Sequence, residues 1–288
     1  MYFDTAEGIV YRPPSEANSF ILRVTIGCSH NSCTFCNMYR QVQFRIRPMK
    51  EIVEQIKSAA AYNPNLKKVF LADGNALVLS TNKLLEIIGL LKSTFPNLAS
   101  ITCYGAPKDT LRKNISELIE LKRAGLRMIY MGIESGNDGI LTSINKGVSS
   151  EEIIMAGQLV RDSGIRLAAM VILGLGGKTH TVQHAISTGK VVSAINPSVL
   201  GVLTLTLEKD APLAIEAEQG KFIPLSPLET VEELQQMLQH IHITRPCVFN
   251  SNHISNLLPL TGTLPRDKEI LLSELKELLS LPRKVQLT

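Results

Sequence analysis

The chain has 288 residues, of which 44% are hydrophobic and 19% are charged, and its formal net charge is +4 at pH 7. This composition is typical of a globular protein with a large core and excludes a disordered or fibrous chain. No apolar run is long enough to span a bilayer, and the N-terminus lacks the uninterrupted apolar region of a signal peptide. We therefore expect a cytoplasmic protein with no membrane partner.

Apolar runs typical of strands alternate with amphipathic runs typical of helices along most of the chain. Strands are predicted over residues 20–26, 68–72, 100–104, 128–133, 167–173 and 199–207. Helices are predicted over residues 49–61, 82–95, 114–123, 150–163, 179–194 and 229–244. Ser149 or Ser150 is a candidate N-cap, and Gly125 and Gly164 follow two of the predicted helix ends. This alternation predicts parallel βαβ units.

Six crossover strands are compatible with an open, doubly wound sheet or with a partial six-stranded barrel. No low-complexity linker divides the chain. We predict an N-terminal entry segment over residues 1–19 and one α/β domain over residues 20–245. A C-terminal loop and helix cap is expected over residues 246–288, with a loop-like stretch before a last helix over 266–279.

The most informative cluster of residues follows the first predicted strand, where Cys28, Cys33 and Cys36 have the spacing C-x4-C-x2-C. Three thiolates on one short loop can bind three irons of a four-iron cluster and leave the fourth iron open. The alternative is a zinc site with His30 as the fourth ligand. The chain lacks the second C-x2-C pair usual in zinc sites, and His30 is too near Cys28 for unstrained tetrahedral ligation, so the pattern favours the cluster.

Unusual residues also follow the second, fourth and fifth predicted strands. They are Asp73, Gly74 and Asn75, then Glu134 and Ser135, then Gly174 and Gly176 in a Gly-Leu-Gly-Gly run. Because ligands bind at the carboxyl ends of parallel strands, we expect all of these residues at one edge. Arg40, Arg45, Arg47 and Lys50 form a basic group after the cysteines. We interpret it as solvated surface that would also suit a polyanionic cofactor, and nucleic acid is not indicated as a partner.

Taken together, the cysteine spacing, Phe35 before the last cysteine, and these strand-end residues resemble the radical S-adenosylmethionine (radical SAM) superfamily over residues 21–207. The likeness is greatest to the branch that includes Elp3, MiaB and coproporphyrinogen oxidase. Two differences stand out: the usual cysteine spacing of the family is C-x3-C-x2-C, and its usual second-strand motif is Gly-Gly-Glu rather than Asp-Gly-Asn. The extra residue marks a less common branch.

The resemblance implies a partial (β/α)6 TIM-type barrel that holds a [4Fe–4S] cluster on Cys28, Cys33 and Cys36. It further implies binding of S-adenosylmethionine at the open iron, reductive cleavage to a 5′-deoxyadenosyl radical, and hydrogen abstraction from a substrate that the sequence does not identify. An electron donor such as flavodoxin or ferredoxin is the implied partner.

Residue by residue, the resemblance places Asp73, Gly74 and Asn75 near the methionine amino group, which Asp73 or backbone carbonyls would contact. Glu134 and Ser135 fall near the ribose, and the backbone of Gly174 and Gly176 near the adenine. The alternative function is a non-catalytic protein that handles clusters or haem on the same fold. The remaining length leaves no room for an appended acetyltransferase, cobalamin-binding or RNA-binding domain, which argues against tRNA methylthiolation.

Other candidate residues have simpler interpretations. Cys103, at the end of the third predicted strand, and Cys247 are expected to be small buried residues. A radical relay or auxiliary ligand is the alternative for Cys103. The polar tract over residues 250–256 is expected to be a hydrogen-bonded loop, with a substrate lid lined by His253 as the alternative.

Overall fold

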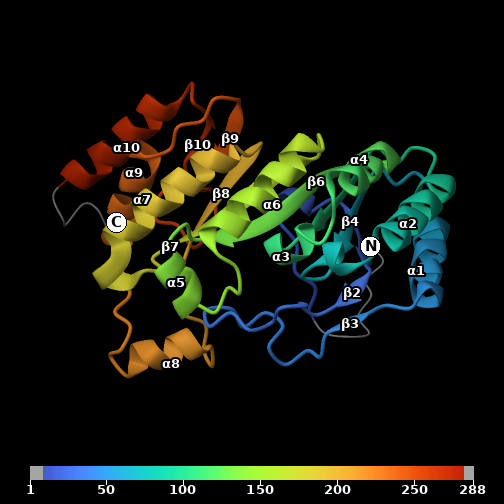
Figure 1. Cartoon of the computed structure of the whole chain (residues 1–288), viewed down its shortest axis with the longest axis horizontal. Helices are drawn as coiled ribbons and strands as arrows, with labels where there is room; N and C mark the ends of the chain where they lie inside the picture. The colour runs from blue at the N-terminus through green and yellow to red at the C-terminus, as the bar shows by residue number, and fades with distance from the viewer. Residues whose placement is uncertain (1–8, 282–288) are drawn as a thin grey trace. The chain divides into compact units, whose positions relative to one another are not determined.

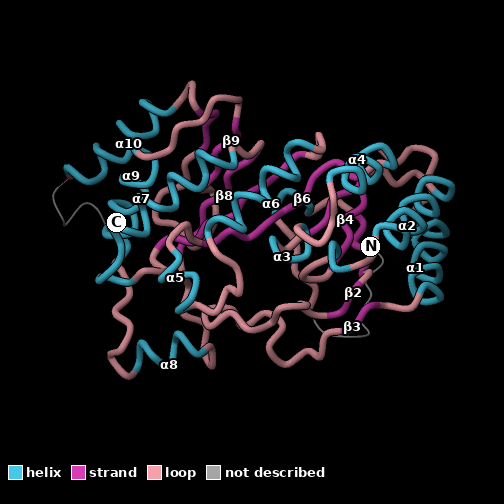
Figure 2. The backbone as a smooth tube through the Cα atoms, viewed as in Figure 1, coloured by secondary structure: helices cyan, strands magenta, loops and turns pink. Residues whose placement is uncertain are grey.

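The computed structural model describes residues 9–281. They divide into two compact units, and both combine strands with helices (Figures 1 and 2). Unit 1 contains residues 9–32, 38–131 and 159–167, and unit 2 contains residues 33–37, 132–158 and 168–281. Residues 1–8 of the predicted entry segment and residues 282–288 of the predicted cap lie outside the described part of the chain.

Unit 1 is built on parallel strands. Their order is β1 (Phe20–Arg23), β4 (Lys68–Ala72), β5 (Ser100–Tyr104) and β6 (Leu126–Glu134), the last three residues of β6 belonging to unit 2. Strands β2 (Thr25–Ile26) and β3 (Arg45–Ile46) pair antiparallel in a separate two-stranded sheet, and residues 27–44 connect them. The helices of unit 1 are α1 (Met49–Tyr62), α2 (Thr81–Thr94), α3 (Pro107–Thr110) and α4 (Ile115–Ala124). Strand β4 is buried from Val69 onward, as expected for a parallel strand covered on both faces.

Unit 2 continues the same alternation. Its strands are ordered β7 (Arg166–Leu173), β8 (Val199–Thr204), β9 (Cys247–Asn250) and β10 (Thr261–Leu264), and only β10 runs antiparallel to its neighbour. The helices that contribute to it are α5 (Asp138–Ser143), α6 (Ser150–Asp162), α7 (Gly177–Ile195), α8 (Pro212–Glu218), α9 (Pro227–Gln239) and α10 (Lys268–Ser280). Figure 1 shows α9 packed between α7 and α10.

The predicted class is confirmed, because the strands of the main sheet are mostly parallel and alternate with helices. No closed barrel is detected among the described strands. Each predicted strand and helix overlaps an observed one, and β4 and β5 have the predicted bounds. The strand predicted over 199–207 ends at Thr204, and the helix predicted over 229–244 ends at Gln239. Ser149 is the N-cap of α6, since its Oγ accepts the Glu152 N–H at 3.2 Å.

Two predictions about local structure were wrong. The first strand is not continuous from 20 to 26, because Val24 separates β1 from β2, which turns to pair with β3 instead of β4. The stretch from residue 246 is not a loop but contains β9 and β10. These strands are short and partly polar. They form because β9 pairs with β8 and β10 pairs with β9, rather than because of a local apolar run.

Within the described residues, no helix combines the length and the apolar character that crossing a membrane requires.

Candidate functional site

Cys28 lies in unit 1, two residues after the end of β2, against the turn formed by residues 73–75. The preceding Gly27 donates its N–H to Asp73 Oδ2 at 3.1 Å, and its carbonyl accepts the Gly74 N–H at 3.2 Å. A Cβ built on Gly74 would lie 3.0 Å from the Cβ of Cys28. Glycine at 74 therefore lets the turn approach the cysteine closely, and the structure brings these two predicted site residues together.

Asp73 is held by Arg23, a residue that sequence reasoning did not select. The Arg23 guanidinium donates to Asp73 Oδ2 from Nη2 at 2.6 Å and from Nε at 3.2 Å, and both side chains are buried. Burial raises the pKa of Asp73, and the hydrogen bond from Arg23 opposes this rise. Asp73 Oδ1 is buried and accepts no hydrogen bond from the described residues.

Asn75 is also fully buried and joins three segments of unit 1. Its Nδ2 donates to Ser29 Oγ at 2.9 Å and to Asp109 Oδ2 at 2.6 Å, and its Oδ1 accepts the Ala106 N–H at 3.1 Å. Ser29 follows Cys28 directly, so Asn75 connects the cysteine segment to the residues after β5. The amide of Asn75 is thus engaged by protein groups, which the sequence did not reveal.

Cys33 and Cys36 lie in unit 2, on a segment fixed between α5 and α8. The Thr34 N–H donates to the Ile144 carbonyl at 2.9 Å, and the Thr34 carbonyl accepts the Leu213 N–H at 3.0 Å. Phe35 packs against a buried apolar cluster that contains Ile140, Ile144, Leu175 and Leu213. The aromatic residue before the last cysteine is therefore the anchor of this segment.

Glu134 ends β6 in a left-handed conformation, with φ of 60°, and its carboxylate folds back over Gly132. Its Oε1 accepts the Lys146 Nζ at 2.8 Å, and both side chains are 12% exposed. A Cβ built on Gly132 would collide with this carboxylate. Gly132 thus makes room for Glu134, and Lys146 is a second residue that the sequence did not single out. The next residue, Ser135, is fully buried and its Oγ accepts the Asn137 N–H at 3.1 Å.

Gly174 and Gly176 lie in the turn between β7 and α7. Gly174 has φ of 83° and Gly177 has φ of 55°, and the Gly177 N–H donates to the Gly174 carbonyl at 3.0 Å. Such φ values are accessible to glycine at little cost, which explains the glycine-rich sequence. Gly176 is the N-cap of α7 and supplies no side chain there.

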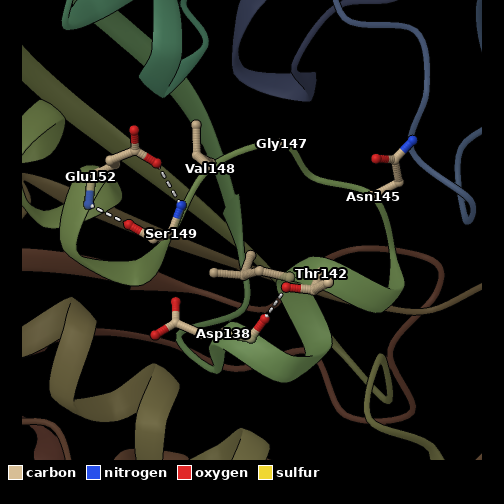
Figure 3. A pocket seen from close by; sticks show the side chains of 8 residues that line it. Asp138, Thr142, Asn145, Gly147, Val148, Ser149 and Glu152 are labelled. Carbon is tan, nitrogen blue, oxygen red and sulfur yellow. Dashed lines mark hydrogen bonds between the residues drawn. The ribbon is translucent and has the colours of Figure 1, made fainter.

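A pocket of about 340 Å³ lies at the loop that joins α5 to α6 (Figure 3). Its lining includes Asp138, Thr142, Ser149 and Glu152. As Figure 3 shows, Ser149 and Glu152 bind each other as the cap of α6, and Thr142 donates to the Asp138 carbonyl. These polar groups are used in local structure.

The remaining candidates are Cys103, Cys247 and the tract of residues 250–256. Cys103 and Cys247 are buried, and burial raises the pKa of each thiol to about 12. In the tract of residues 250–256, Asn256 Oδ1 accepts the Thr204 hydroxyl at 2.8 Å and Asn256 Nδ2 donates to the Val202 carbonyl at 2.8 Å. The tract is therefore a hydrogen-bonded loop at the carboxyl end of β8, as expected, and His253 Nδ1 hydrogen-bonds Ser255.

The donor set fits an iron–sulfur cluster. Cys28, Cys33 and Cys36 are partly exposed thiols, and thiolates are the usual ligands of such clusters. Within residues 9–281, no three cysteine, histidine or acidic side chains are arranged so that they could hold a single metal ion.

The sequence profile described as "Radical SAM superfamily" matches residues 22–188, more than half of the chain. The chain belongs to the radical SAM superfamily. Members of this superfamily use a [4Fe–4S] cluster and S-adenosylmethionine, so the predicted family and cofactors are confirmed. The match contains all three cysteines and every strand-end residue predicted from the sequence.

Two curated relatives are similar to this radical SAM chain. The putative methylthiotransferase MJ0865 of Methanocaldococcus jannaschii is 23% identical over 74% of this chain and 51% of that protein. The heme chaperone HemW of Bacillus subtilis is 20% identical over 61% of this chain and 48% of that protein. The chain thus spans about half the length of these relatives.

The structure is also similar to that of the coproporphyrinogen III oxidase HemN of Escherichia coli, described as a radical SAM enzyme. The TM-score is 0.55 with 18% identity, over 77% of this chain and 51% of that chain. This likeness supports the partial-barrel type of fold.

Proposed function

We propose that this chain is a radical SAM enzyme in which Cys28, Cys33 and Cys36 ligate the [4Fe–4S] cluster. The observation that carries the proposal is the superfamily match over residues 22–188, which includes the three cysteines in one short segment. Each end of that segment is fixed: Gly27 and Ser29 bind the turn of residues 73–75, and Thr34 binds α5 and α8. When bound and supplied with one electron, the cluster and S-adenosylmethionine provide methionine and a 5′-deoxyadenosyl radical that abstracts hydrogen.

The turn of residues 73–75 would bind the amino group of S-adenosylmethionine. Asp73 Oδ2 and the Asn75 amide are already engaged by protein groups. The groups we assign to the amino nitrogen are therefore Asp73 Oδ1, which has no hydrogen-bond donor in the described structure, and the backbone carbonyls of the turn. Arg23 holds the carboxylate in place and partly balances its charge.

Unit 2 supplies the proposed contacts to the nucleoside. Glu134 would accept hydrogen bonds from the ribose hydroxyls, and Lys146 orients its carboxylate. Ser135, also assigned near the ribose, is buried, and its Oγ accepts the Asn137 N–H after β6. The glycines at 174 and 176 would allow the adenine to approach the backbone closely. An electron-transfer protein such as flavodoxin or ferredoxin is the proposed reductant, and the substrate is left unassigned.

The second candidate function is a non-catalytic protein that handles clusters or haem, which the similarity to the heme chaperone HemW favours. The two functions differ in what happens to S-adenosylmethionine. An enzyme releases 5′-deoxyadenosine repeatedly, whereas a handling protein binds its cargo without sustained cleavage.

The proposed cluster is tested by anaerobic reconstitution with iron and sulfide. We expect a brown protein with about four irons per chain and, after reduction, an electron paramagnetic resonance (EPR) signal that changes when S-adenosylmethionine is added. The single variants C28A, C33A and C36A should each lose this signal, and C103A, whose thiol is buried, should keep it. A colourless protein that takes up zinc instead would contradict the proposal.

A further inference from the structure

Glu233 on α9 is a buried carboxylate that accepts a hydrogen bond from the glycine-rich turn between β7 and α7. Its side chain is fully buried. Its Oε1 accepts the Gly174 backbone N–H at 2.7 Å and the His184 Nδ1 at 3.0 Å, and its Oε2 accepts the Thr181 hydroxyl at 2.6 Å. All of its partners belong to the turn after β7 or to α7.

A carboxylate that accepts three short hydrogen bonds holds its donors more firmly than a neutral group does. The bond to Gly174 fixes the peptide plane between Leu173 and Gly174, at the point where the chain enters the left-handed region. Without this acceptor, the Gly174 N–H would lose its partner. The turn would keep its internal bond from Gly177 to Gly174, and the bond from the His180 N–H to the Gly176 carbonyl would remain. Glu233 therefore adds a side-chain constraint at Gly174 to a turn whose glycines only permit its conformation.

The packing of α9 on α7 does not depend on this carboxylate alone. Glu229 on the same face of α9 binds Lys178 Nζ at 2.9 Å, and this hydrogen bond is the main cause that lowers the pKa of Glu229 to about 2. Val231, Leu234, Met237 and Leu238 of α9 are buried as well. A buried carboxylate is costly to retain when apolar packing would serve. Its bond to Gly174 in the turn and its bonds to Thr181 and His184 in α7 therefore indicate a role in holding the turn.

We propose that Glu233 is a positioning residue for the adenosine part of S-adenosylmethionine. It holds residues 174–177 in the conformation that receives the nucleoside, and Thr181 and His184 keep the carboxylate in place. This inference rests on the proposed function, which assigns the adenine to that turn.

The test compares three variants of the reconstituted protein. E233A removes the acceptor, and E233Q keeps an amide oxygen that still accepts from Gly174. E232A is the matched control, because Glu232 is the neighbouring acid on α9 and is exposed. The measurements are the dissociation constant for S-adenosylmethionine, by calorimetry at a temperature well below unfolding, and the EPR signal of the reduced cluster without S-adenosylmethionine.

We expect E233A to bind S-adenosylmethionine about tenfold more weakly, because the unsatisfied Gly174 N–H lets the turn relax. E233Q should stay within about threefold of the parent chain and E232A should match it. The EPR signal without S-adenosylmethionine should be the same in all three. If E233A does not fold, T181V replaces it, and we expect a weaker loss of about threefold, since only one donor to the carboxylate is removed.

The inference is wrong if E233A, or T181V in its place, lowers the melting temperature but binds S-adenosylmethionine like the parent chain. It is equally wrong if E233Q binds as weakly as E233A. If the reconstituted parent chain itself fails to bind S-adenosylmethionine, the proposed function is overturned and the inference falls with it. Whether the parent chain binds S-adenosylmethionine therefore distinguishes a failure of the Glu233 inference from a failure of the proposed function.

Discussion

Arg23 and Asp73 form a buried ion pair at 2.6 Å, and the same carboxylate oxygen accepts the backbone N–H of Gly27, next to Cys28. The pair therefore connects β1, the turn after β4 and the start of the cysteine segment. We therefore expect the same contacts to affect both stability and cluster binding.

Removing one partner of this pair should be strongly destabilising. R23M leaves the Asp73 carboxylate buried without its counter-ion, and we expect the free energy of unfolding to fall by about 3–5 kcal/mol. Chemical denaturation measures this change. R45M is the matched control: Arg45 is 37% exposed and lies 3.5 Å from Glu51, so it should cost at most about 1 kcal/mol. If R23M and R45M lower the free energy of unfolding equally, the prediction that burial makes the Arg23–Asp73 pair more important for stability is wrong.

The amide of Asn75 should matter for both the fold and the cluster. N75A leaves the Ala106 N–H without its acceptor and removes the bond to Ser29, so unfolding should become easier by about 1–3 kcal/mol. Chelators should also remove iron faster from the reconstituted variant. N97A, at an exposed amide that pairs with Asn65, should change neither property. Iron loss at the parent rate in N75A would contradict this role of the amide.

The lack of a side chain at Gly132 leaves room for the Glu134 carboxylate, and this gives a test of the role of Glu134. G132A should push the Glu134 carboxylate away from Lys146 at little cost in stability, because a side-chain end can move. We expect G132A and E134A each to weaken binding of S-adenosylmethionine by about tenfold, and the double variant to be no worse than either. Calorimetry on the reconstituted protein measures this, with G89A as the control, since a Cβ there meets no atom within 4 Å. Additive losses would mean that Gly132 acts independently of Glu134.

Alkylation should separate the cluster thiols from the structural ones. Because burial raises the pKa of Cys103 and Cys247 to about 12, both stay protonated and unreactive at pH 8, and they gain thiolate only as the pH approaches that value. Cys28, Cys33 and Cys36 are partly exposed and should react with iodoacetamide at pH 8 in the apo protein. Reconstitution with iron and sulfide should protect these three. Mass spectrometry of peptides reports each site, and modification of Cys103 before Cys28 would oppose this assignment.

The sequence predicted those elements whose pattern is local. β4 and β5 are short apolar runs, and their observed bounds match the predicted ones. Asp73, Glu134 and Gly174 lie at or directly after strand ends, as the sequence predicted, and their roles in binding stay predictions.

The contacts that fix these residues were not predictable. Arg23 lies inside an apolar run, and its partner Asp73 is 50 positions away, so no local pattern connects them. Glu233 and Glu232 are adjacent acids on an amphipathic helix, and only the packing of α9 shows which of them is buried. β9 was missed because its alternation of buried and exposed residues spans only four positions.

The most direct test of the account is release of 5′-deoxyadenosine by the reconstituted, chemically reduced protein given S-adenosylmethionine under anaerobic conditions. We predict 5′-deoxyadenosine and methionine in equal amounts over repeated turnovers, and none from the C28A, C33A and C36A variants. A reconstituted protein with an intact cluster that binds S-adenosylmethionine but releases no 5′-deoxyadenosine would contradict the enzyme assignment.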